Sequence, residues 1–154
     1  MTIEDDIAFL ERIPFLRRIG APALRILAIG AESYRVEPGQ VLFAAGETAD
    51  GAYIVQQGSF NLRPQAGAEA DVVAGPGTLL GEAALLAETQ RPATAMAREA
   101  STVLRIPRAM FLKMLEGYPE AAQRLREVIA ARADEWARDM ENVRTALVAD
   151  IEPK

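Results

Sequence analysis

Residues 75–95 read GPGTLLGEAALLAETQRPATA and contain the most informative pattern in the chain. Gly81 lets the backbone come close to a ligand, and the residues after it are expected to form one helical turn whose first N–H groups lack partners within the helix. Arg91 follows nine residues after Glu82. Unpaired amides and a guanidinium together form a cradle for a phosphate, and the Glu82 carboxylate can accept hydrogen bonds from sugar hydroxyls or brace the arginine. The segment therefore predicts an anion-binding site.

The same segment resembles the phosphate-binding cassette of the cyclic-nucleotide-binding domain family, in which Gly-Glu, a small residue, a leucine-rich turn and a spacer precede an arginine and Ala-Thr or similar. The matching positions are Gly81, Glu82, Ala84, Leu85, Arg91, Ala93 and Thr94. Matches outside the cassette include Pro38-Gly39-Gln40, Gly46-Glu47, Tyr53-Ile54-Val55 and Phe111 to Leu115. These elements occur in order over about Phe15 to Leu125, so the resemblance implies the fold of this family.

The resemblance also implies roles for individual residues. The Glu82 carboxylate would accept from the ribose 2′-hydroxyl, Arg91 would bind the exocyclic oxygens of the cyclic phosphate, and Gly81 and Ala84 would donate backbone N–H groups. Apolar residues before the cassette would line the pocket for the base and sugar. The residues expected at the ligand are Val72, Val73, Leu80, which form this apolar lining, and Gly81, Glu82, Ala83, Ala84, Arg91 and Pro92.

Pro92 departs from the pattern of the family. Relatives commonly carry a small residue there, often Ala, Ser or Thr, whose N–H or hydroxyl reaches the phosphate, and proline has neither donor. Losing one charge-assisted contact costs about 1.5–3 kcal/mol, or about one to two decades of affinity. The missing hydroxyl, which favours guanine in some relatives, makes cyclic AMP the expected ligand and cyclic GMP the second choice.

Two other interpretations remain open at this point. Glu82 and Arg91 can form an internal ion pair that only holds a loop. The chain can also be a protein-interaction or scaffold domain that keeps the fold without binding nucleotide, an interpretation that Pro92 favours. Our first hypothesis is a non-enzymatic regulatory module for signal transduction, in which a cyclic nucleotide shifts the final helix between two positions and an unidentified protein partner responds.

The composition excludes several classes of function. The chain has no cysteine and no histidine, so it lacks the usual general base, thiolate nucleophile and imidazole metal ligand. We therefore expect no enzymatic activity, no catalytic residue, no cofactor and no metal. The net charge of −5 opposes DNA or RNA binding. No apolar run approaches the length of a membrane span and the N-terminus is acidic, which predicts a cytoplasmic protein without membrane contact.

The pattern along the 154 residues predicts one domain in three zones. Residues 1–30 have helical spacing, with Thr2 and Asp5 in a capping-box pattern. Residues 31–107 contain short apolar stretches separated by turn residues, which is typical of an antiparallel β-roll of the jelly-roll kind. Residues 108–149 are expected to be helical again, with a break at Gly117-Tyr118-Pro119. The fold class is therefore mainly β, with N-terminal helices and a long C-terminal helix.

The expected C-terminal helix has an apolar stripe that its own β-roll is too short to cover. The stripe consists of Ile129, Trp136, Met140, Val143 and Leu147, with Arg132 as an unfavourable member. It can dock on the same β-roll, but the length of the helix favours a homodimer formed along it. Trp136 can instead cover the base of a bound nucleotide, although packing is the commoner role of a tryptophan on such a stripe.

Overall fold

The computed structural model describes residues 2–64, 71–128 and 131. Within these residues the helices are α1 (Ile3–Glu11), α2 (Ala21–Gly30) and α3 (Arg108–Gly117), with 3-10 turns η1 (Arg17–Ile19) and η2 (Glu82–Leu85). Residues 119–128 are also helical. The strands are β1 (Glu32–Val36), β2 (Val41–Phe43), β3 (Thr48–Ala49), β4 (Gly51–Gln57), β5 (Phe60–Pro64), β6 (Val72–Ala74), β7 (Leu79–Leu80), β8 (Thr89–Gln90), β9 (Ala93–Ala97) and β10 (Ser101–Pro107).

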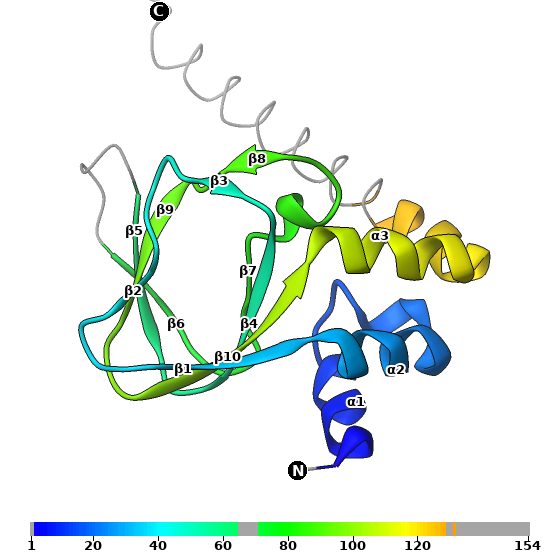
Figure 1. Cartoon of the computed structure of the whole chain (residues 1–154), viewed down its shortest axis with the longest axis horizontal. Helices are drawn as coiled ribbons and strands as arrows, with labels where there is room; N and C mark the ends of the chain where they lie inside the picture. The colour runs from blue at the N-terminus through cyan, green and yellow to red at the C-terminus, as the bar shows by residue number, and fades with distance from the viewer. Residues whose placement is uncertain (1, 65–70, 129–130, 132–154) are drawn as a thin grey trace, which may run out of the picture.

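The strands form a β-roll built from antiparallel pairs. One sheet has the order β1-β10-β4-β7 and the other the order β2-β9-β5-β6, while β3 pairs with β8 beside them. Figure 1 shows the helices gathered together at one side of this roll. The expected fold class, an antiparallel β-roll flanked by helices from both ends of the chain, is confirmed.

Two apolar clusters hold the structure together. One fills the roll and includes Val55, Phe60 and Val103, which are fully buried. The other joins the helices to the outer side of β4 and β10, and it includes Leu24 and Phe111. Strands β4 and β10 separate the two clusters, and each contributes buried side chains to both of them. The turn η2 packs on the second cluster, because Leu85 belongs to it and Ala84 is also buried.

The ends of the chain follow the sequence pattern as far as the structure describes it. Thr2 and Asp5 form the expected capping box at the start of α1, each side chain accepting from the other residue's N–H at 3.2 Å. The chain changes from helix to strand between Gly30 and Glu32. The stripe from Ile129 to Leu147, including Trp136, lies outside the described residues, so the single domain spanning 1–154 stays a prediction. In the described part of the chain, no helix has both the length and the apolar character needed to cross a membrane.

Candidate functional site

Gly81 places the start of η2 beside the side chain of Arg91. Its backbone is in the left-handed region, with φ 80° and ψ 39°, which favours glycine. A Cβ atom on this residue would collide with Nη1 of Arg91. The sequence therefore needs glycine here for two independent reasons, backbone conformation and room for the guanidinium.

Arg91 is buried, with 5% of its surface exposed, although it is a charged residue. Its Nη2 donates a hydrogen bond to the carbonyl of Gly51 at 2.8 Å. Among the described residues, Nη1 of Arg91 is the one buried side-chain nitrogen or oxygen that has no hydrogen-bond partner. A buried N–H without a partner is costly, so this atom points to a group that binds there.

Among the residues that the structure describes, no carboxylate forms a salt bridge with Arg91. The salt bridges found within residues 2–64 and 71–128 are made by other arginines, namely Arg25, Arg35, Arg63 and Arg105. Burial lowers the pKa of the Arg91 guanidinium, while Tyr53, Asp50 and Glu47 act in the opposite direction. Because an arginine still keeps its proton in proteins, the site contains a buried positive charge that an anion can neutralise.

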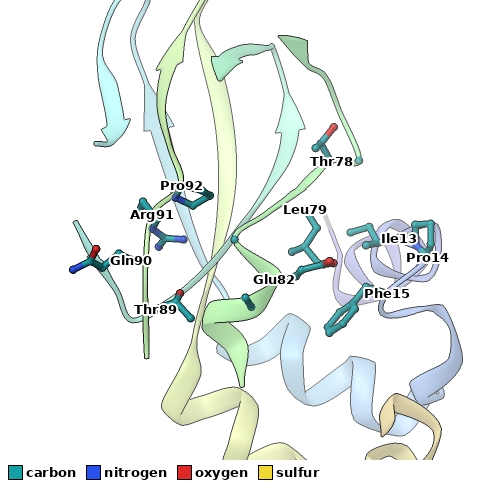
Figure 2. A pocket seen from close by; sticks show the side chains of 13 residues that line it. Ile13, Pro14, Phe15, Thr78, Leu79, Glu82, Thr89, Gln90, Arg91 and Pro92 are labelled. Atoms are coloured by element: carbon teal, nitrogen blue, oxygen red, sulfur yellow. The ribbon is translucent and has the colours of Figure 1, made fainter. Parts of the chain in front are cut away.

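A cavity of about 660 Å³ lies between the N-terminal segment and residues 77–92. It is lined by Ile13, Pro14, Phe15, Gly77, Thr78, Leu79, Gly81, Glu82, Ala83, Thr89, Gln90, Arg91 and Pro92. Figure 2 shows Arg91 and Pro92 on one side of this cavity and Ile13 and Phe15 on the other, with Glu82 between them. The cavity therefore combines a cation and a carboxylate with an apolar wall.

Five of the residues expected at the ligand line this one cavity, which are Gly81, Glu82, Ala83, Arg91 and Pro92. Ala84 differs from expectation, because it is 1% exposed and its N–H donates to the carbonyl of Gly81 at 3.0 Å. The tight 3-10 turn thus satisfies internally the amide that the resemblance implied for the phosphate. That role of Ala84 is not supported in this conformation.

The three apolar residues expected around the base do not line this cavity. Leu80 is 5% exposed and packs inside the roll, opposite Tyr53 in the β4–β7 pair. Val72 and Val73 are 58% and 53% exposed, because the short strand β6 is an edge of its sheet. Contact of these three residues with a base stays a prediction.

Several residues around the site were not expected there from the sequence. Phe43 and Tyr53 lie under the Arg91 guanidinium, and Phe15 forms part of the apolar wall. Tyr53 and Phe15 fall inside the matched range, but no local pattern ties either to Arg91. These contacts join segments about 40 residues apart or more, so periodicity carries no signal for them. Among the described residues, no group of three or more acidic, histidine or cysteine side chains is arranged to hold a metal ion.

Arg108, the first residue of α3, fixes the segment that carries the site. Its Nη1 donates to the carbonyls of Ala49 at 2.9 Å, of Ala84 at 3.2 Å and of Ala87 at 3.2 Å. These carbonyls belong to β3, to η2 and to the residues just after η2. A single cation thus links the start of α3 to β3 and to the η2 segment.

Comparison with known proteins identifies a family whose model matches more than half of the chain. Residues 34–118 match the family model described as a cyclic nucleotide-binding domain. The solved structure of a cyclic nucleotide-binding-like protein from Brucella abortus is 37% identical, with a TM-score of 0.64, and the match covers 73% of this chain and 98% of that chain.

Two further relatives are longer proteins. The cyclic AMP receptor protein of Thermus thermophilus is 33% identical over 119 residues, which are 75% of this chain and 55% of the receptor. Lysophospholipase NTE1 of Chaetomium globosum is 30% identical over 104 residues, which are 66% of this chain and 7% of the enzyme. The chain thus spans about half of the receptor and a small fraction of the lysophospholipase.

Proposed function

This chain belongs to the cyclic nucleotide-binding domain family, and we propose that it binds a cyclic nucleotide with the phosphate held at Arg91. The observation that carries the proposal is the buried Nη1 of Arg91, which has no hydrogen-bond partner. A cyclic phosphate is a compact anion with two exocyclic oxygens. It would satisfy this donor and neutralise the buried charge in one step.

The lining of the cavity supports the same ligand class. The carboxylate of Glu82 would accept from a sugar hydroxyl, and the backbone of Gly81 and Ala83 borders the same space. Thr78 and Thr89 also line the cavity and add two hydroxyl-bearing residues to its polar lining. Because no hydroxyl stands at position 92, cyclic AMP is the ligand we propose and cyclic GMP the weaker one.

We further infer that the chain acts by binding and not by catalysis. Occupancy of the cavity would shift α3, because Arg108 connects the first residue of this helix to η2. The helix that follows at residues 119–128 would carry that shift to a partner, either a second copy of the chain or another protein. We propose that the protein works in the cytoplasm, without contact to DNA, RNA or membrane.

Calorimetric titration with cyclic AMP and cyclic GMP tests the proposal. We expect the wild-type protein to bind cyclic AMP more tightly than cyclic GMP. Arg91→Met should lower the affinity for cyclic AMP at least about tenfold. The matched control is Arg63→Met, which removes an exposed arginine that pairs with Asp71 away from the cavity. Arg91→Met removes a buried cation but also the donor to the Gly51 carbonyl, so thermal unfolding of both variants is measured to show that the loss of affinity is not a loss of folding.

Two results would count against cyclic-nucleotide binding at Arg91. Undiminished affinity of Arg91→Met would place the phosphate elsewhere in the molecule. A folded wild-type protein that binds neither nucleotide would favour a protein-interaction domain that retains the fold.

A further inference from the structure

The Arg91 guanidinium rests on two aromatic rings inside the roll. Its Cζ atom is 4.4 Å from the ring centroid of Phe43 and 5.5 Å from that of Tyr53. The two rings stack on each other at 5.9 Å with an interplanar angle of 27°. Phe43 ends β2 and Tyr53 lies in β4, so the pair brings together strands from the two different sheets.

A planar guanidinium offers different surfaces to different partners. Its faces attract aromatic rings, whereas its N–H donors lie along the edge. In this structure the guanidinium lies over the two aromatic rings, and its Nη2 donor is anchored on the Gly51 carbonyl. The donor Nη1 is left on the edge, beside the backbone of Gly81 at the start of η2.

Whether an aromatic ring or a carboxylate supports the Arg91 guanidinium makes a difference to anion binding. A carboxylate would hold the guanidinium equally well, but it would neutralise the charge and compete with an incoming anion. An aromatic face attracts the cation through its quadrupole and leaves the full positive charge in place. The Gly51 carbonyl is likewise neutral.

We propose that Phe43 and Tyr53 are positioning residues that hold Arg91 as a buried, un-neutralised cation with one donor edge directed to the ligand site. The inference rests on the proposed function for the identity of the ligand. The aromatic support itself can be tested without any ligand.

The ligand-free test follows the side-chain N–H resonances of Arg91 by NMR, assigned by their absence in Arg91→Met. Ring currents should shift these resonances upfield in the wild-type protein, and Phe43→Leu should move them back. Phe60→Leu is the matched control, because Phe60 belongs to the same buried cluster while the rings under the guanidinium are those of Phe43 and Tyr53.

The second test measures cyclic AMP affinity by calorimetry in the same variants. We expect Phe43→Leu and Tyr53→Leu each to weaken binding by about three- to tenfold, the range expected for losing one cation–π contact. Tyr53→Phe keeps the aromatic ring and should bind cyclic AMP with the affinity of the wild type. Phe60→Leu should bind as the wild type does, and thermal unfolding of every variant separates these effects from a general loss of stability.

The outcomes distinguish this inference from the proposed function. If the Arg91 resonances are unshifted in the wild type, or do not respond to Phe43→Leu, the aromatic support is overturned. Unchanged affinity of Phe43→Leu in a protein that does bind cyclic AMP also overturns it. If the wild type binds no cyclic nucleotide while the resonances behave as expected, the proposed function fails and the positioning role of the rings is supported.

Discussion

A methyl group at position 81 would meet two obstacles in this structure. Alanine would be strained at the left-handed φ of 80°, and its Cβ would collide with Nη1 of Arg91. The first effect acts on stability, since the left-handed region costs a non-glycine residue about 1–2 kcal/mol. The second acts on function, because the guanidinium would have to leave its position. At the scale of single residues, the two effects can be separated by experiment.

We predict that Gly81→Ala lowers the free energy of unfolding by about 1–2 kcal/mol and also weakens cyclic AMP binding. Gly39→Ala is the control, because Gly39 has nearly the same φ of 81° but a Cβ there would meet nothing within 4 Å. The control should lose similar stability and keep its affinity. Denaturant unfolding and calorimetry measure the two quantities. Equal affinity losses in both variants would show that backbone strain alone, without the collision at Arg91, disturbs the site.

At the scale of elements, the turn η2 depends on helix α3 for its position. It has only four residues and no side-chain cap, so its own hydrogen bonds provide little stability. Arg108 supplies additional support. Its guanidinium donates hydrogen bonds to the carbonyls of Ala84 and Ala87, and also to the carbonyl of Ala49. A change in η2 is thereby connected to α3 by direct contacts.

We predict that Arg108→Met lowers stability by about 1–3 kcal/mol, because it leaves partly buried carbonyls without their donor. Hydrogen exchange of the η2 amides should become faster, and cyclic AMP affinity should fall. Arg35→Met removes an exposed arginine paired with Glu37 and should change stability by less than about 1 kcal/mol. Exchange in η2 that is no faster than in the Arg35 variant would contradict this role of Arg108.

At the scale of the whole molecule, the helical side of the β-roll leaves apolar side chains accessible. Ile26 and Ile29 of α2 and Leu112 of α3 are 37%, 62% and 38% exposed. Single exposed apolar residues are common, but these three belong to helices that Figure 1 shows on one side of the roll, and the sequence of residues 129–147 contains the expected apolar stripe as well. Both features are consistent with an interface between two copies of the chain.

We predict that the full chain sediments as a homodimer and that a version ending after Arg132 sediments as a monomer. The reason is that truncation removes Trp136, Met140, Val143 and Leu147, which carry most of the apolar stripe. Analytical ultracentrifugation at several concentrations tests this. A monomeric full-length protein would rule out the dimer. A truncated protein that still dimerises would place the interface outside the removed residues.

The order of helices and strands was largely readable from local pattern. The capping box at Thr2 and the break at Tyr118 each depend on residues close in sequence, and the structure has an element boundary at each. Exposure of Val72 and Val73 was not readable in this way. It depends on the place of β6 at a sheet edge, which the arrangement of distant strands sets.

The chemistry of the site was contained in residues 81–92, since glycine, carboxylate and arginine stand close together in sequence and their types alone indicate an anion. The surroundings of Arg91 in the folded protein could not be predicted from these residues. Its burial, its rest on Phe43 and Tyr53 and its free Nη1 arise because β2, β4 and the segment before β9 meet inside the roll. The apolar wall from Ile13 to Phe15 was likewise hidden, because it depends on where the N-terminal segment packs. Local sequence specifies chemical groups and turns, whereas burial and partners are set by contacts between residues far apart in the chain.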